Sequence, residues 1–435
     1  MLATDLLMAG RSLRQHTRRN LALGFAVALV AALLILFLGL VAGIRGAMME
    51  SAATIISGHV NVGGFYKITS GAAAPLVSDV PKLLAVVRRL VPEAAYLTTR
   101  GRGYAKIISD STSQDLVLSG VDVDQELGLH KVLSIKEGRL DDLRQPDTIL
   151  LFEKQAERLK VRVGDAVTVA APTARNVNNT IDVRVVAIAR SVGVLSSIVA
   201  FLPEPTLRAL YLLSDTTAGA IHVYLKDPDQ SARVAARLLG DLRAAGYEVM
   251  DYDPQPYWMK LMQKVNSEDW TGQKLDVTSW EDEMSFLDFM LQIISGLAAI
   301  LIGVILFIVV IGVMNTLWIA IRERTREIGT LRAIGMQRAK VAWLLLLEST
   351  LLGLGGSTLG ALAGWGVAAW VNARGWKVGE GLQMVLMQDH FSILVRPGTV
   401  LGAVLGLTLL AGLAALLPAF QAARLRPVTA MHHIG

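Results

Sequence analysis

The 435-residue chain has no cysteine, which excludes disulfide bonds, cysteine-ligated zinc, iron–sulfur clusters and a cysteine nucleophile. Charged residues are scarce as well: they make up 18% of the sequence, where a soluble domain carries roughly 25%. Hydrophobic residues make up 53%. This composition indicates a membrane protein. The net charge of +5 is small for the length, so nucleic acid is not expected as a partner.

Motifs for ATP hydrolysis and for zinc-dependent catalysis are also missing. No G-x-x-x-x-G-K-[ST] occurs, so the chain lacks a phosphate-binding loop of the Walker type. No H-E-x-x-H occurs, and the seven histidines show no spacing typical of zinc ligands. We therefore expect a non-catalytic chain with no metal and no cofactor of its own.

Four apolar segments are long enough to cross a bilayer: residues 21–44, 289–321, 341–371 and 399–420. At about 1.5 Å per helical residue, each exceeds the roughly 30 Å hydrocarbon core. A cleaved signal peptide is the alternative for the first segment, but that run is about twice as long as a typical h-region. The second segment is so long that one end must project or the helix must tilt.

Basic residues in the flanks predict the orientation of these spans. The amphipathic segment 1–20 holds four Lys and Arg, residues 322–340 hold six, and the tail 421–435 holds two. The short loop 372–398 holds three. We expect both termini in the cytoplasm, with basic flanks against the anionic lipids. Residues 45–288 are then extracytoplasmic.

The segment between the first two spans is far too long to be a loop without structure of its own. Alternating apolar and polar residues predict strands around 161–169, 181–185 and 221–225. Apolar residues at helical spacing predict helices around 83–90 and 234–242. The expected fold class is therefore an α-helical membrane protein with four transmembrane helices plus a large mixed α/β extracytoplasmic domain.

Within this domain we expect two mixed α/β pieces, about 55–121 and 216–254, on either side of a β-rich insertion, about 122–215. A stalk at about 278–288 should connect the domain to the second span. Thr278 and Glu281 have the spacing of a capping box, which predicts a helix start. We expect this helix to continue as a stiff rod into the second span; the alternative is a short surface helix followed by a break.

The apolar spans contain two kinds of unusual residue. Glu348 is the one charged residue inside a span, and it fits either a structural polar anchor or a role in proton or substrate movement. Glycines recur every four residues in the third span and at the start of the fourth, which favours close helix packing. These glycines are Gly356, Gly360, Gly364, Gly398, Gly402 and Gly406.

Residues 322–340, between the second and third spans, carry a dense cluster of charge. Ile328, Leu331 and Ile334 recur at helical spacing, which predicts a short amphipathic helix that offers arginine and glutamate to a partner. The alternative is a solvated loop.

The run E-R-T-R-E-I-G-T-L-R-A-I-G at residues 323–335 resembles the signature of FtsX-like permeases, the MacB and LolCDE type of ABC transporter. The layout is also similar: one span, a large external domain and three further spans. The tail from Pro418 resembles the P-A-x-x-A ending of the family. The run S-G-H-V-N-V at residues 57–62 is similar to that of lipoprotein-releasing permeases, although an ordinary strand with an exposed His59 would explain it equally well.

This resemblance implies a permease that converts ATP hydrolysis by a separate ATPase dimer, which binds ATP and Mg, into extracytoplasmic work. It implies a second permease as partner, either another copy or a paralogue. Lipoprotein release is the first functional expectation; the alternatives are macrolide or peptide efflux with a periplasmic adaptor, and non-transporting regulation of a cell-wall hydrolase. The residues that match the coupling signature are Glu323, Arg324, Thr325, Arg326, Glu327, Gly329, Leu331, Arg332 and Gly335.

Overall fold

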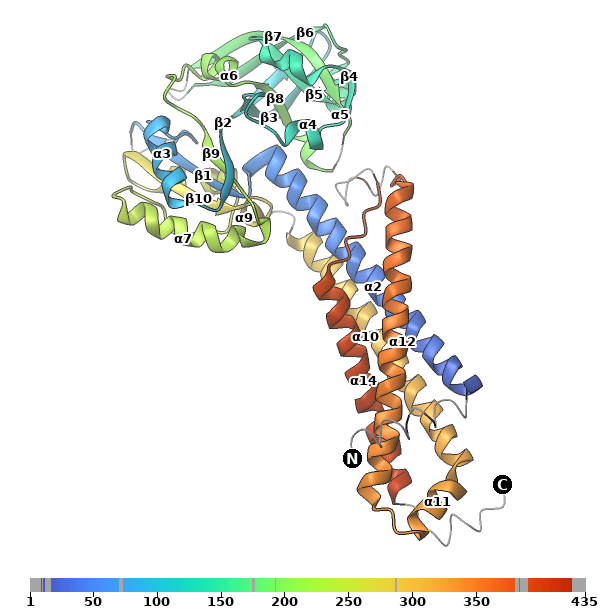
Figure 1. The fold of residues 1–435 in the computed structure, drawn as a ribbon. Helices are drawn as coiled ribbons and strands as arrows, with labels where there is room; N and C mark the ends of the chain where they lie inside the picture. The colour runs from blue at the N-terminus through green and yellow to red at the C-terminus, as the bar shows by residue number, and fades with distance from the viewer. Residues whose placement is uncertain are drawn as a thin grey trace. The chain divides into compact units, whose positions relative to one another are not determined.

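In the computed structural model the chain forms two compact units (Figure 1). The first unit comprises Met1–Ile44, Leu291–Lys377 and His390–Gly435; the second comprises Arg45–Met290 and Val378–Asp389. The structure describes residues 9, 11, 17–69, 73–173, 177–191, 193–285, 288–379, 383 and 390–424. Most of the expected segment 1–20, residues 380–382 and 384–389 of the loop 372–398, and the end of the tail lie outside the described residues.

The first unit is built from long helices, and four of them are long and apolar enough to cross a membrane. Their candidate spans run over Asn20–Ser57, Ser295–Glu323, Arg338–Arg374 and Pro397–Ala423. The helices of this unit are α2 (Thr17–Ala52), which continues into the second unit, α10 (Asp288–Glu323), α11 (Thr325–Ala333), α12 (Arg338–Arg374) and α14 (Pro397–Ala423). A shared apolar core joins α2, α10, α12 and α14.

The second unit is a mixed α/β domain around a sheet in the order β10-β1-β9-β2-β3-β8-β5-β7-β4, with β6 paired to β2 and β7. The strands are β1 (Val60–Lys67), β2 (Ala94–Ile108), β3 (Ser113–Val121), β4 (Ile135–Gly138), β5 (Thr148–Phe152), β6 (Ala166–Pro172), β7 (Asn178–Ala189), β8 (Val199–Pro203), β9 (Ala220–Leu225) and β10 (Gly272–Ser279). The helices are α3 (Val80–Leu90), α4 (Leu129–Val132), α5 (Glu153–Leu159), α6 (Glu204–Tyr211), α7 (Ser231–Ala244), α8 (Tyr257–Gln263) and α9 (Trp280–Glu283). Together with the four apolar helices, this domain confirms the expected fold class.

The long strand β2 belongs to both halves of this domain. Its first part pairs with β9, and its second part, from Gly101, pairs with β3 and β6. The β-rich half therefore begins inside β2, earlier than the expected boundary near residue 122. The α/β half extends past the expected boundary at 254, because β10 pairs with β1 along its full length. Sequence periodicity marks strands but not their partners, which explains the difference.

The four-stranded part β10-β1-β9-β2 has two chemically distinct faces. Residues at alternate positions, such as Val62, Val223 and Val277, form an apolar core under α3 and α7. The residues between them face the opposite side and are mostly polar, although they are also buried. Because strand side chains alternate between the two faces of a sheet, each of these strands contributes to both layers.

The helix that follows β10 corrects two expectations about the stalk. Ser279, not Thr278, caps α9: the Ser279 side chain accepts a hydrogen bond from the Asp282 backbone at 3.3 Å, and Asp282 Oδ2 accepts from the Ser279 backbone at 2.8 Å. Thr278 is still a strand residue, and its hydroxyl donates to Glu283 Oε1. Helix α9 ends at Glu283 and α10 begins at Asp288, so the expected continuous rod is wrong and a short helix is observed.

Candidate functional site

The segment with the coupling signature forms a corner between two long helices, which we call the α11 corner (residues 322–340). Helix α10 ends at Glu323, α11 covers Thr325–Ala333, and α12 begins at Arg338. Gly335 ends α11 with φ +101°, a conformation that L side chains rarely adopt. Its N–H donates to Arg332 O, and the next N–H donates to Leu331 O, which is the Schellman arrangement. The turn into α12 therefore requires this glycine.

One side of the α11 corner is anchored in the helical unit. Ile328 is buried in an apolar cluster with Ile321 of α10, Leu345 of α12 and Ala419 of α14. Gly329 is buried beside it. The Thr325 hydroxyl donates to Ile321 O and Arg322 O, which satisfies carbonyls at the end of α10. Helix α11 is present, but of the three apolar residues whose spacing predicted it only Ile328 is buried; Leu331 is 37% and Ile334 79% exposed.

A buried ion pair fixes the same corner. Arg324 Nη1 lies 3.1 Å and 3.3 Å from the two carboxylate oxygens of Glu348 in α12, and the two side chains are 9% and 6% exposed. Sequence reasoning placed Arg324 at a partner surface and Glu348 separately inside a span. The structure brings them together, so Arg324 holds the corner from inside and Glu348 has the contacts of a polar anchor.

The other side of the α11 corner is open to solvent. Glu323, Arg326, Glu327 and Leu331 are exposed, and Arg332 is half-buried. Exposed charge of both signs, with an apolar side chain between the charged groups, can bind a complementary protein surface. These residues lie on an element that buried contacts hold in place, so the surface is presented in a defined orientation.

The two glycine series differ in their surroundings. A Cβ atom at Gly356, Gly360 or Gly364 would come within 2.8, 2.0 or 2.9 Å of a backbone carbonyl oxygen of α2. These three glycines therefore allow α12 and α2 to touch along their backbones. At the second series, Gly398, Gly402 and Gly406, no described atom lies within 4 Å of such a Cβ, so the structure shows no close packing there.

The buried polar face of the sheet is a site that sequence reasoning missed. We call it the polar layer: Asn61, Thr98, Arg100, Arg102, His222, Tyr224, Asp276 and Thr278, together with Glu126, Lys260 and Glu283, which cover them. The single available signal was the alternation Thr98, Arg100, Arg102 in a strand. That pattern normally marks a solvated face, so it gave no reason to expect burial.

Arg100 connects three parts of the α/β domain at this layer. Its Nε donates to Glu126 Oε1 at 2.9 Å, and its Nη2 lies 2.8 Å from the same oxygen. Its Nη1 donates to Thr54 O and Ile55 O at 2.8 Å and 3.0 Å. Those carbonyls belong to the π-helical turn η1 (Ala53–Ser57), which directly follows α2. Arg100 thus joins the end of the first long helix to β2 and to the β-rich half.

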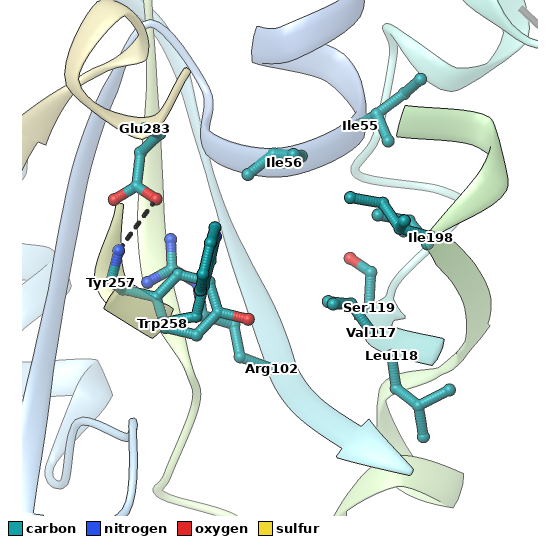
Figure 2. Close-up of a pocket in the computed structure, with 11 residues that line it drawn as sticks. Ile55, Ile56, Arg102, Val117, Leu118, Ser119, Ile198, Tyr257, Trp258 and Glu283 are labelled. Atoms are coloured by element: carbon teal, nitrogen blue, oxygen red, sulfur yellow. Dashed lines mark hydrogen bonds between the residues drawn. The ribbon is translucent and has the colours of Figure 1, made fainter. Parts of the chain in front are cut away.

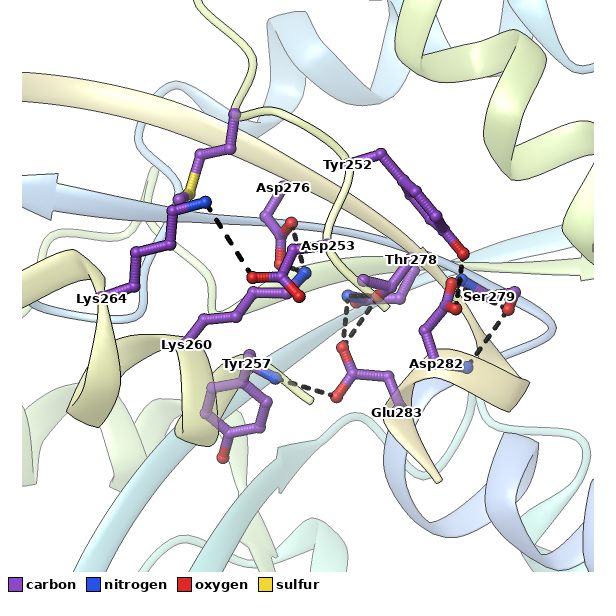
Figure 3. Close-up of polar contacts among 12 residues, drawn as sticks. Tyr252, Asp253, Tyr257, Lys260, Lys264, Asp276, Thr278, Ser279, Asp282 and Glu283 are labelled. Carbon is purple, nitrogen blue, oxygen red and sulfur yellow. Dashed lines mark hydrogen bonds and ion pairs between the residues drawn. The ribbon is translucent and has the colours of Figure 1, made fainter. Parts of the chain in front are cut away.

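A second set of contacts in the polar layer fixes α9 (Figure 3). Glu283 Oε1 accepts hydrogen bonds from Thr278 Oγ1 and Asn61 Nδ2, and Glu283 Oε2 accepts from Tyr257 N. Burial raises the pKa of Glu283, which the positive charge of Arg102 opposes. Nearby, the Lys260 ammonium lies 2.8 Å from Asp276 in a fully buried ion pair.

His59 is not the exposed strand residue that sequence reasoning allowed. Its Nδ1 accepts a hydrogen bond from Leu225 N at 2.9 Å, and its ring meets Tyr224 edge-on at 5.5 Å. Burial lowers the pKa of His59. Gly58, which precedes it, has φ +67°, and the turn allows the chain to leave η1 and enter β1.

Among the described residues, no three histidines, cysteines or carboxylates are grouped so that they could hold a metal ion. The geometry shows helix ends that are held by buried ion pairs, and a corner with exposed charged residues.

Comparisons with known proteins match both parts of the chain. Residues 21–240, which are 220 of the 435, match the MacB-like periplasmic core domain, and residues 299–427 match the FtsX-like permease C-terminal family. The chain is 31% identical over 172 residues to the uncharacterized ABC transporter permease YknZ of Bacillus subtilis, covering 39% of this chain and 40% of that protein. It is 33% identical over 123 residues to a macrolide export ATP-binding/permease protein MacB of Chlorobaculum tepidum, covering 28% of this chain and 17% of that protein.

The aligned regions thus span less than half of these relatives. Among solved structures, the extracellular domain of YknZ from Gram-positive bacteria is 16% identical with a TM-score of 0.28, covering 42% of this chain and 95% of that one. The periplasmic region of MacB from Actinobacillus actinomycetemcomitans is 15% identical with a TM-score of 0.29, covering 44% and 86%. From the two family matches, the chain belongs to the MacB- and FtsX-like family of ABC transporter permeases.

Proposed function

We propose that this chain is a permease subunit that carries motion from a partner ATPase dimer to its extracytoplasmic α/β domain. The exposed charge of the α11 corner supports this, because Glu323 at the end of α10 and Arg326 in α11 are exposed at a corner that the buried Arg324–Glu348 pair fixes from inside. ATP and Mg bind to the ATPase, and a second permease, either another copy or a paralogue, completes the complex. The chain spans a bacterial inner membrane with both termini in the cytoplasm.

Charge reversal at the exposed corner tests this coupling. Glu323→Arg and Arg326→Glu, each made in the complex with its ATPase, should abolish stimulated ATP turnover while membrane insertion is retained. Arg158→Glu, at an exposed position of α5, is the matched control and should leave turnover unchanged. Normal stimulation in both corner variants would refute the coupling role.

The absence of cysteine allows a direct test of orientation. Single cysteines at Thr330 in α11 and at Asp110 in the α/β domain are both at exposed positions. A membrane-impermeant maleimide added to intact spheroplasts should label Asp110→Cys and spare Thr330→Cys until the membrane is opened. The reverse pattern would place the α11 corner outside and remove its access to an ATPase.

The substrate is proposed from two separate indications. The S-G-H-V-N-V run supports lipoprotein release at the outer leaflet. The relatives named macrolide export proteins support export of a macrolide or peptide with a periplasmic adaptor at least equally. Mass spectrometry of the purified complex distinguishes these: a co-purified lipoprotein supports release, an adaptor supports export, and a cell-wall hydrolase would show the non-transporting regulator.

A further inference from the structure

A cleft in the α/β domain has the size and lining of a ligand site. It encloses about 400 Å³, within the range of roughly 300–1,000 Å³ typical of small-molecule pockets. Its floor is the face of β2 and β3 that carries Tyr104 and Val117, which lie opposite each other in register. Trp258 and Met262 of α8 form one wall, and Ile198, next to β8, forms the other.

The rim of this cleft exposes an unusual amount of apolar surface for a water-facing domain. Tyr104 is 61% exposed, Met262 74% and Trp258 38%. A group of exposed aromatic and aliphatic side chains around a concave surface marks a binding site more often than a solvated face. Methionine adapts its shape to an apolar ligand, and tyrosine and tryptophan add large contact surfaces.

A second, inner cavity of about 40 Å³ adjoins the cleft (Figure 2). The two spaces share Val117, Ile198, Tyr257 and Trp258 as lining residues, so they lie side by side. Arg102 and Glu283 line this inner cavity, together with the η1 residues Ile55 and Ile56. The inner cavity has room for a small polar group, and the cleft beside it has room for a longer apolar chain.

The inner cavity offers hydrogen-bond donors from a buried cation. Arg102 is 9% exposed, and among the described residues its guanidinium donates one hydrogen bond, from Nη2 to Asn61 Oδ1 at 2.7 Å. The Tyr257 ring lies 4.3 Å from the guanidinium carbon. A guanidinium has five N–H donors, so it retains capacity for an oxygen acceptor in the cavity. The two oxygens of Glu283 already accept from Asn61, Thr278 and Tyr257.

We propose that this cleft binds a straight aliphatic chain that ends in a carboxylate, with the chain between Trp258 and Ile198 and the carboxylate at Arg102. A carboxylate matches the fork of donors on arginine, and the apolar walls match the chain. Asp115, the charged residue at the outer rim, lies opposite Lys106 in register and does not repel an acid that enters with its head inward. The site is independent of the transport proposal, because it requires neither ATPase nor partner.

A photoreactive fatty acid tests this directly on the full chain in lipid nanodiscs. A palmitic acid with a mid-chain diazirine should label the segment 257–262 and the neighbourhood of Ile198, with excess palmitate suppressing the labelling. The methyl ester of the same probe should label these peptides about tenfold less, because it loses the charge-assisted hydrogen bonds to Arg102. Labelling confined to the membrane helices, or equal labelling by acid and ester, would overturn the proposal.

Two variants and a matched control separate binding from folding. Arg102→Met should reduce labelling by the acid about tenfold to the level of the ester. Ile198→Trp, at a position 36% exposed, should fill the cleft and abolish labelling by both probes with an unchanged denaturation midpoint. Leu127→Trp, 59% exposed and outside the cleft, should label like the parent. Undiminished labelling in Ile198→Trp would contradict the site even if Arg102→Met fails to fold.

Discussion

Each compact unit contains a buried arginine–glutamate pair that joins a helix end to a neighbouring element. The two pairs differ in how far the protein shields them from solvent. Arg100 and Glu126 are 1% and 0% exposed, and the same guanidinium also binds two carbonyls at the end of α2. Arg324 and Glu348 are 9% and 6% exposed and join the end of α10 to α12. A buried charge is tolerated when its partner and further hydrogen bonds replace water. Breaking the Arg100–Glu126 pair should therefore lower the free energy of unfolding more than breaking the Arg324–Glu348 pair.

Breaking the pair in the α/β domain should have the largest effect. Arg100→Met leaves Glu126 buried without its cation and removes a donor from Thr54 O and Ile55 O, at a cost of about 3–5 kcal/mol in the free energy of unfolding. The urea midpoint of the α/β domain in the full chain measures it. The double variant Arg100→Met/Glu126→Leu should recover part of the loss. Arg144→Met, which breaks an exposed pair, is the control and should leave the midpoint unchanged.

Breaking the pair at the α11 corner should cost less, about 3 kcal/mol, because it is closer to solvent. Arg324→Met should lower the thermal midpoint of the nanodisc-reconstituted chain and loosen α11, which limited proteolysis would detect. Arg326→Met, two residues further and exposed, is the matched control for stability. If both substitutions shift the midpoint equally, the buried pair has no special role.

Overfilling the helix contact should cost about 1–3 kcal/mol. In Gly360→Ala the new methyl group would lie 2.0 Å from Ala28 O, so α2 and α12 must separate. In Gly402→Ala the new methyl group meets no described atom within 4 Å. The first variant should lower the thermal midpoint, and the second should keep it. Equal behaviour would show that α2 and α12 do not pack this closely in a bilayer.

Lowering the pH should have the smallest effect on stability, through protonation of His59. Its folded pKa lies below the unfolded value of 6.5, so the unfolded state binds protons first as the pH falls. Burial of the neutral imidazole lowers the pKa, so the stability linked to it is complete above about pH 6.5 and is lost as the pH falls through the lowered folded pKa. Urea midpoints between pH 7.5 and 5.5 should decline less steeply in His59→Gln than in the parent. His130→Gln, exposed in the same domain, should retain the full slope.

Local patterns in the sequence identified much of the membrane unit. Long apolar runs predicted four spans because hydrocarbon thickness sets a minimum helix length. The spacing of Ile328 predicted an amphipathic α11, and the signature at 323–335 predicted the family. The same local reasoning assigned Arg324 to an exposed surface, because a charged residue in a charged run carries no sign of burial.

In the α/β domain, local patterns predicted elements but not their partners. The strands at residues 181–185 and 221–225 lie within β7 and β9. The polar layer remained hidden, because Asn61 and Thr278, which share a hydrogen bond, are 217 residues apart. The misplaced cap at Thr278 has the same origin: strand register commits its hydroxyl to Glu283.

By itself, the sequence determined how many segments the bilayer can hold, that a folded domain stands between the first two, and which residues carry the family signature. Those properties depend on runs and spacings along one stretch of chain. Tertiary structure alone decided that Arg324 and Arg100 are buried, that one glycine series touches a neighbouring backbone and the other does not, and that a cavity lined by Arg102 lies beside the cleft. Each of these depends on which distant segment covers a side chain, and helix packing and strand register fix that choice.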